Sequence, residues 1–266
     1  MRTQRLTDLP DNVRRLIEKV SGSPVVDVGT INAGLNSAIA ARVSLDSRTL
    51  FIKGLPLNHP RVWTLKREAQ VSPYVVGIAP RLLWHAEADG WRLLAFEYID
   101  GAHADYTPKS PDLPGVMASM IQLSEVPAPA LELKTMPHRL RTYVDDAADL
   151  SWFAGNHLLH TEWNPHNVLM TADHARFVDW GWASIGAAWI DPALWLLWLI
   201  AHGHTCEQAE NAASDHPAWD LAPARGLDAL ARTQHRLWDS IAAQSPDDWA
   251  KPMQAAAATW EAYRTR

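Results

Sequence analysis

The 266-residue sequence is poor in cysteine and in long apolar segments. Its single cysteine, Cys206, excludes an internal disulfide framework. The longest apolar run, residues 193–201, has nine residues, whereas a membrane-spanning helix needs roughly 20, so we expect a buried helix there. The first residues also lack the apolar core of a signal peptide. We therefore expect a cytoplasmic protein that does not enter a membrane.

Basic residues are scarce in the second half of the chain. Residues 145–266 contain 7 Lys or Arg against 16 Asp or Glu, a net charge of −9, whereas residues 1–144 carry +3. An acidic half disfavours nucleic acid as a partner and favours a small cationic one. The excess carboxylates equally fit a surface that is simply well hydrated. A composition of 47% hydrophobic and 20% charged residues fits one globular chain, monomeric or homodimeric.

The most informative motif is His160-Thr-Glu-Trp-Asn-Pro-His-Asn167, which is followed ten residues later by Phe-Val-Asp179-Trp-Gly. Transfer of a γ-phosphoryl group requires a carboxylate directed at the attacking hydroxyl and oxygen ligands that hold Mg²⁺ against the nucleotide. The spacing predicts Glu162 as the catalytic carboxylate and Asn167 and Asp179 as the metal ligands. It matches the kinase pattern H-x-D-x-x-x-x-N followed by D-x-G, with Glu in the Asp position.

Two other interpretations apply to the same residues. His, Asn and Pro are frequent in ordinary turns, and Asp-Trp-Gly is compatible with a simple hairpin. The neighbouring His157, His160 and His166 are potential zinc ligands, although their spacing matches no standard zinc motif. The tryptophans nearest to these motifs, Trp163 and Trp182, are candidates for lining an acceptor pocket, while most of the 14 tryptophans are expected in the core.

Further parts of a nucleotide site precede these motifs in the expected order. Residues 48–53 read as a strand that ends in Lys53, and residues 60–71 read as a helix that contains Glu68. An ion pair between Lys53 and Glu68 would direct the lysine toward the α and β phosphates. In isolation, an exposed Lys and a solvated Glu would explain both residues equally well.

Two more segments are candidates for contact with the nucleotide. A Gly-, Asn- and Ser-rich turn between two strand-like runs could cover the phosphates, with Asn36 and Ser37 as side-chain donors. Residues 91–101 read as a strand that runs into a turn, where the backbone at about Phe96 and Tyr98 would meet the adenine edge. Each segment also fits an ordinary turn or core strand.

Taken together, these residues resemble the aminoglycoside phosphotransferase family, a branch of the protein-kinase-like superfamily of small-molecule kinases. The resemblance covers nearly the whole chain and implies an α+β, bilobal protein-kinase-like fold. A β-rich nucleotide-binding lobe would span residues 1–98, and a mainly helical acceptor-binding lobe would span residues 99–266. It also implies ATP or GTP as co-substrate with Mg²⁺, and a small hydroxyl-bearing acceptor such as an aminoglycoside-like antibiotic, a sugar or an amino alcohol. Asp191-Pro192 matches a further family motif, in which Asp191 would cap a helix and brace the catalytic loop.

The sequence departs from the family pattern at Glu162, where the family has Asp, and after Asp191-Pro192, where a second acidic residue is absent. The longer side chain moves the carboxylate by up to about 1.5 Å, and a misplacement of about 1 Å can lower the rate roughly a hundredfold. A pseudokinase that binds a nucleotide or small ligand is therefore the alternative to an active enzyme. A protein kinase is disfavoured, because only eleven residues separate Asp179 from Asp191, too few for an activation segment.

Overall fold

The chain folds into two compact units in a computed structural model that describes residues 11–30, 37–245 and 248–266. Unit 1 comprises the described residues up to Gly101 together with Arg176–Trp182, and unit 2 comprises Ala102–Ala175 and Ala183–Arg266. The sequence placed the boundary after residue 98. It gave no indication that Arg176–Trp182, the segment that carries Asp179, returns to the first unit.

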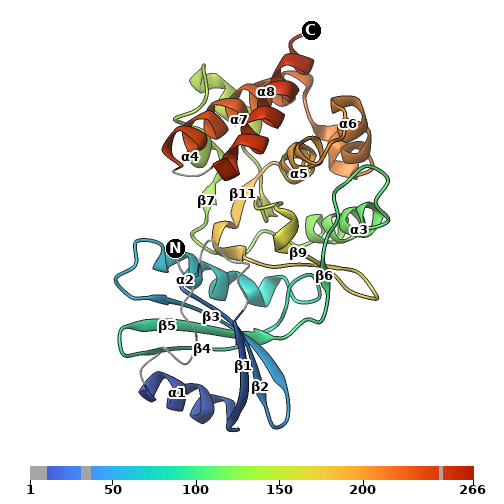
Figure 1. Ribbon diagram of the computed structural model, residues 1–266. Coiled ribbons are helices and arrows are strands. Elements are labelled where there is room, and N and C mark those ends of the chain that lie inside the picture. Colours follow the sequence, from blue (N-terminus) through green and yellow to red (C-terminus); the bar gives the residue numbers. More distant parts are fainter. Residues whose placement is uncertain (1–10, 31–36, 246–247) are drawn as a thin grey trace. The chain divides into compact units, whose positions relative to one another are not determined.

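Unit 1 is built on a five-stranded antiparallel sheet with the strand order β1-β2-β3-β5-β4 (Figure 1). Its elements are α1 (Asp11–Ser21), β1 (Val25–Thr30), β2 (Ile39–Leu45), β3 (Thr49–Pro56), α2 (Val62–Val71), the 3-10 turn η2 (Ser72–Tyr74), β4 (Leu82–Ala88), β5 (Trp91–Glu97), β10 (Ala175–Phe177), at whose start the chain enters this unit, and the 3-10 turn η5 (Trp180–Trp182).

The two faces of this sheet carry separate apolar clusters, because successive side chains of a strand point to opposite faces. Leu50 and Ile52 of β3 pack in one cluster with Ile17 of α1. Leu55 packs in the other with Leu65 of α2. Lys53 has the same parity as Leu55, so the alternation directs this lysine to the face that α2 covers. The pattern of β3 thus places one charged side chain beneath a helix.

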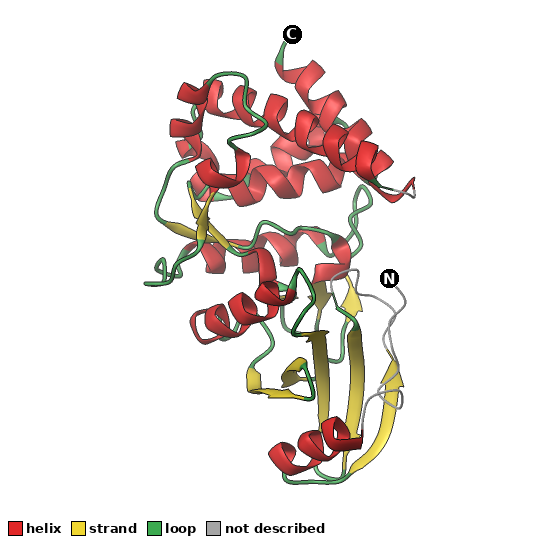
Figure 2. Cartoon of the chain, turned by 90° about the vertical axis from the view of Figure 1, so that its left-hand side faces the viewer, coloured by secondary structure: helices red, strands yellow, loops and turns green. Residues whose placement is uncertain are grey.

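Unit 2 is mainly helical (Figure 2). Its elements are β6 (Ala102–His103), α3 (Leu113–Ser124), β7 (Lys134–Thr135), α4 (Met136–Leu140), η3 (Ala147–Phe153), β8 (His157–Leu159), η4 (Pro165–Asn167), β9 (Val168–Met170), β11 (Ser184–Gly186), α5 (Ile190–Ala201), α6 (Cys206–Ser214), η6 (Pro217–Leu221), α7 (Ala224–Gln244), η7 (Asp248–Ala250) and α8 (Lys251–Arg264). Strand β11 lies between β7 and β8, and β6 pairs with β9.

The main expected elements are present with small shifts at their ends. The apolar run at residues 193–201 is the body of α5, most of which is buried. The helix expected from residue 60 begins at Val62, and the strand expected to end at Lys53 continues to Pro56. No helix among the described residues is long and apolar enough to cross a membrane. The α+β fold expected from the sequence is confirmed.

Candidate active site

In unit 1, the Lys53 ammonium group binds two carboxylates. Its Nζ lies 2.9 Å from Glu68 Oε2 on α2 and 2.8 Å from Asp179 Oδ1, which precedes η5. The three side chains are 9%, 5% and 16% exposed, respectively. The expected Lys53–Glu68 ion pair is therefore present, and Asp179 joins it. The sequence did not predict the Lys53–Asp179 bond, since 126 residues separate the partners.

The charges in this cluster depend on one another. Burial alone would lower the pKa of Lys53, but the Asp179 and Glu68 carboxylates outweigh burial and raise that pKa above its ordinary value. Burial raises the pKa of Glu68, and the Lys53 ammonium opposes that shift. Lys53 is therefore a firmly protonated cation with two acidic partners. Shifted pKa values of this kind are frequent at functional sites.

Helix α2 packs against η5, the turn that follows Asp179. Asp179 has φ = 66°, a left-handed conformation that Asp tolerates better than most residues. A Cβ added at Gly181 would approach the Thr64 side chain of α2 to 2.7 Å, so this glycine permits close packing of η5 on the helix. The Trp182 ring meets Trp63 of α2 edge to face at 5.0 Å between centroids. These contacts hold the Asp179 carboxylate against Lys53.

Unit 2 carries the predicted catalytic loop, in which Glu162 and Asn167 are directly connected. The Asn167 side-chain amide donates a hydrogen bond to the Glu162 backbone carbonyl at 3.1 Å. Within the loop, the Asn164 side chain accepts from the His166 backbone N–H at 2.9 Å, and Pro165 begins the 3-10 turn η4. The turn expected from the Asn, Pro and His residues is therefore present. Its effect is to bring the two predicted site residues together.

Asp191 braces this loop from behind. Its carboxylate accepts hydrogen bonds from the backbone N–H groups of His160 (2.8 Å) and Thr161 (3.0 Å) and from Nε1 of Trp163 (2.9 Å). The prediction that Asp191 caps a helix is wrong, because α5 begins at Ile190 with Trp189 at the cap position. The predicted brace is confirmed. Trp163 is fully buried, so it supports the loop and does not line an acceptor pocket.

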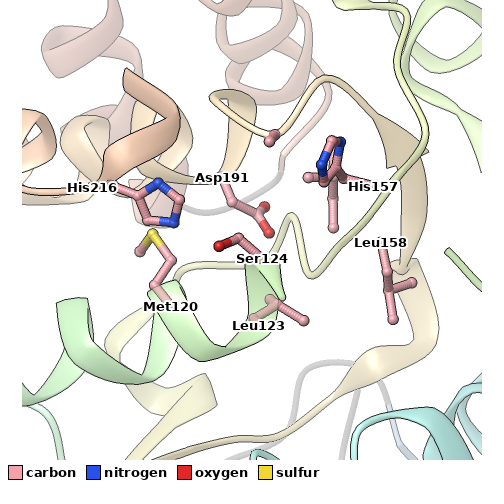
Figure 3. Close-up of a pocket in the computed structure, with 9 residues that line it drawn as sticks. Met120, Leu123, Ser124, His157, Leu158, Asp191 and His216 are labelled. Carbon is pink, nitrogen blue, oxygen red and sulfur yellow. The ribbon is translucent and has the colours of Figure 1, made fainter. Parts of the chain in front are cut away.

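A small cavity adjoins the brace (Figure 3). Its volume is about 10 Å³, near the minimum that holds one water molecule. The side chains of Asp191, Ser124 and His216 surround it (Figure 3).

Burial raises the pKa of Asp191 to about 6, against the three hydrogen bonds and the nearby Arg139, which lower it. The carboxylate therefore titrates far above the ordinary value for Asp.

Arg139, which no sequence motif indicated, contacts the same loop. It lies in the short helix α4, and its Nη1 donates to Thr161 Oγ1 at 2.7 Å and to Ser184 Oγ at 3.0 Å. Its Nη2 lies 3.9 Å from Glu162 Oε1. Burial lowers the pKa of Arg139, and Glu162 and Asp191 oppose that shift. No local pattern marks an arginine 23 positions before its carboxylate partner as part of a site.

The remaining residues predicted to contact the nucleotide lie at the ends of strands, within a strand or outside the described residues. Asn36 lies outside the described residues. Ser37 is buried two residues before β2, and its hydroxyl has no hydrogen-bond partner among the described residues. Phe96 lies within β5, with cross-strand neighbours on both sides, whereas Tyr98 follows the last paired residue. Their contacts with a nucleotide stay predictions.

The described residues offer no cluster of three or more His, Cys, Asp or Glu side chains able to hold a metal ion. Of the three histidines considered for zinc, His160 is fully buried and His157 is exposed. The His166 ring packs edge to face on His103, with 4.8 Å between centroids. The described histidines therefore give no support to a zinc site.

Comparison with known structures defines the class of fold. No protein-family model matches the sequence, and no curated protein matches it. Solved structures do match in shape, and they have the fold of protein-kinase-like small-molecule kinases. The resemblance seen in the motifs is thus confirmed at the level of the fold.

Three of these structures illustrate the class. Choline kinase LicA from Streptococcus pneumoniae aligns with a TM-score of 0.68 at 13% identity, over 96% of this chain and 100% of its own. Aminoglycoside phosphotransferase APH(4)-Ia, in a ternary complex with ADP and hygromycin B, aligns with a TM-score of 0.61 at 18% identity, over 93% and 98%. Macrolide 2'-phosphotransferase MphH from Brachybacterium faecium gives 0.56 at 18%, over 94% and 98%.

Proposed function

We propose that this chain is a small-molecule kinase, which transfers the γ-phosphoryl group of ATP or GTP to a hydroxyl group of a small acceptor. The observation that carries the proposal is the buried Lys53 ammonium group, paired with Glu68 at 2.9 Å and Asp179 at 2.8 Å. A buried ion-pair cluster is weak evidence for stability, because desolvation offsets the attraction. A role in ligand binding or catalysis therefore explains the cluster better than a role in stability. The fold supports such a role, since the similar proteins are phosphotransferases.

Lys53 would bind the nucleotide phosphates in this function. Glu68 holds the lysine from α2, so the ammonium group has a fixed direction before any ligand arrives. The structures of LicA with AMP and of APH(4)-Ia with ADP support nucleotide binding on this fold. Tyr98, just beyond β5, and Ser37, just before β2, are the proposed additional contacts in unit 1.

Asp179 and Asn167 would hold Mg²⁺. Both offer side-chain oxygen atoms, which suit this ion, and Mg²⁺ is commonly bound by one or two carboxylates together with phosphates and water. Oxygen donors of this kind suit Mg²⁺ better than the nitrogen- and sulfur-rich sets of structural zinc. When bound, Mg²⁺ would neutralise charge on the phosphates. The side-chain amide bond of Asn167 to the Glu162 backbone would keep the amide oriented.

Glu162 would accept a hydrogen bond from the acceptor hydroxyl and orient it for attack. Phosphoryl transfer depends mainly on positioning and electrostatics, so a glutamate held in place can serve. The net charge of −9 over residues 145–266 supports a cationic acceptor, such as an amino alcohol or an amino sugar. The acceptors named for the similar structures, choline and hygromycin B among them, belong to those proteins and supply a starting panel.

Nucleotide consumption across such a panel tests the proposal. ATP and GTP would each be supplied with Mg²⁺ and with choline, hygromycin B, a macrolide and simple sugars. We expect acceptor-dependent turnover that Glu162→Gln and Asp179→Asn abolish. The matched controls Glu132→Gln and Asp173→Asn change exposed residues of the same types and should keep full activity. Equal turnover in all five proteins would refute the proposed site.

The alternative is a pseudokinase that binds a nucleotide or small ligand without turnover. The observation that favours it is the glutamate at the catalytic position, with its carboxylate beside the Arg139 cation. In that case every acceptor would fail with the native chain, whereas ATP would still bind and Lys53→Met would abolish the binding. Isothermal calorimetry with ATP and Mg²⁺ separates this outcome from a protein that binds no nucleotide.

A further inference from the structure

We infer that Arg139 is a positioning residue for Glu162, and that the two side chains form a matched pair in which glutamate is the required length. The inference rests on the proposed function and adds a residue to its site. Arg139 contacts neither nucleotide nor acceptor in this scheme. It acts by holding the carboxylate that does.

The guanidinium group has a fixed position. Its side chain is 20% exposed, and Nη1 donates to two hydroxyl groups, on Thr161 at 2.7 Å and on Ser184 at 3.0 Å. Ser184 is fully buried in β11, the middle strand of its small sheet. A planar guanidinium held at one nitrogen directs its other nitrogen as well. Nη2 is the atom that faces Glu162 Oε1, at 3.9 Å.

The peptide that carries Glu162 is held by the same arginine. Thr161 has φ = 68°, a left-handed conformation that is a true outlier for a β-branched residue. Such strain persists only where the surroundings over-determine the backbone. Here the Thr161 backbone N–H is bound by Asp191 and its hydroxyl by Arg139. Arg139 therefore contributes to both the backbone and the side-chain position of the next residue.

The separation of charges explains why the glutamate fits. Replacing Glu162 with Asp would draw the carboxylate back by up to about 1.5 Å. From 3.9 Å, the separation from Nη2 would increase to about 5 Å, and the carboxylate would lose its orienting cation. In this loop the longer side chain is thus a complement to Arg139. The substitution that would restore the family residue should impair the enzyme.

A double-mutant cycle on turnover tests the pairing. We expect Glu162→Asp to lower kcat about tenfold or more in the native background, and Arg139→Gln to do the same with little change in the KM for nucleotide. In the double variant, Glu162→Asp should add almost nothing, because its partner is already absent. Arg139→Lys should recover part of the activity. Arg141→Gln, an exposed arginine on the same segment, is the control. Higher activity in Glu162→Asp, or losses that multiply independently, would overturn the inference.

A second measurement needs no turnover. The titration midpoint of the Glu162 side-chain carboxyl can be followed by carbon-13 NMR, with Glu162→Gln identifying the signal. Removing a cation raises the midpoint of a nearby carboxyl group, so Arg139→Gln should shift it upward while Arg141→Gln leaves it unchanged. If Arg139→Gln fails to fold, Ser184→Ala serves instead. It removes one hydrogen bond of the guanidinium group and should also shift the Glu162 midpoint upward.

The two proposals can fail separately. An upward shift without turnover for any acceptor would refute the proposed kinase activity and keep the positioning role of Arg139. Turnover without any shift in Arg139→Gln or Ser184→Ala would overturn the positioning role and keep the kinase activity.

Discussion

Replacing Lys53 with Met would remove the cation that the buried Glu68 and the half-buried Asp179 carboxylates share. Glu68 and Asp179 each lie within 2.9 Å of the Lys53 ammonium, and their side chains are 5% and 16% exposed. Methionine fills nearly the same volume, so the packing beneath α2 is retained and the charge alone is lost. Breaking a buried ion pair by removing one partner costs about 3–5 kcal/mol. We expect the free energy of unfolding to fall by that amount at pH 8.

The loss should shrink as the pH is lowered. Burial already raises the pKa of Glu68 in the native chain, and removal of the ammonium would raise it further. In the folded variant this carboxyl group then holds a proton that the unfolded chain has released, so the stability of the variant increases toward acidic pH. At pH 5 we therefore expect a smaller loss than at pH 8. Lys53→Met/Glu68→Gln should recover part of the stability at pH 8.

Urea denaturation followed by tryptophan fluorescence at the two pH values measures these changes. The control is Lys66→Met, which removes an exposed lysine from α2, the helix that carries Glu68, and should change stability by less than about 0.5 kcal/mol. A loss below about 1 kcal/mol for Lys53→Met would mean that the two carboxylates are compensated elsewhere. A loss that is equal at pH 5 and pH 8 would show that neither carboxylate takes up a proton.

Two further changes test other parts of the structure. Because the pKa of Asp191 is raised to about 6 from 3.8, the folded chain holds a proton between these values that the unfolded chain releases. The free energy of unfolding of the native chain should therefore fall by up to ~3 kcal/mol as the pH rises through that window, and then stay constant. Asp191→Asn lacks this titrating group. Denaturation of both chains at pH 4 to 7 should show the pH-dependent difference between them. Gly181→Ala would bring a Cβ to 2.7 Å from the Thr64 side chain, and overpacking of this kind costs about 1–3 kcal/mol, whereas Gly29→Ala meets no atom within 4 Å and should be nearly neutral in the same thermal-melting assay.

Each of these expectations has a clear contrary result. A difference between native and Asp191→Asn chains that is constant from pH 4 to 7 would mean that Asp191 ionises at its ordinary pKa. Equal melting temperatures for Gly181→Ala and Gly29→Ala would mean that η5 moves away from α2 without cost.

Local sequence patterns determined the secondary structure and the candidate residues. Short strand-like runs marked β3 and β5, the segment from residue 60 marked α2, and the apolar run at residues 193–201 marked α5. Short fixed spacings selected Glu162 and Asn167, since a loop of six residues brings its own ends together. The order of Lys53, Glu68 and the two later motifs indicated the fold. Local spacing and order along the chain can both be read directly from the sequence, so the sequence alone reveals these features.

Only the tertiary structure decided how these residues are held. The bond between Lys53 and Asp179 joins residues 126 positions apart, and the brace from Asp191 reaches back 31 positions to His160. Arg139 became part of the site because α4 places it beside Thr161 and Ser184. Such partners are selected by which surfaces pack together when the core forms. Packing between distant segments leaves no periodic trace in the chain. For this reason the sequence indicated the candidate residues, with Glu68 and Asp191 as their supports, but neither Arg139 nor the bond between Lys53 and Asp179.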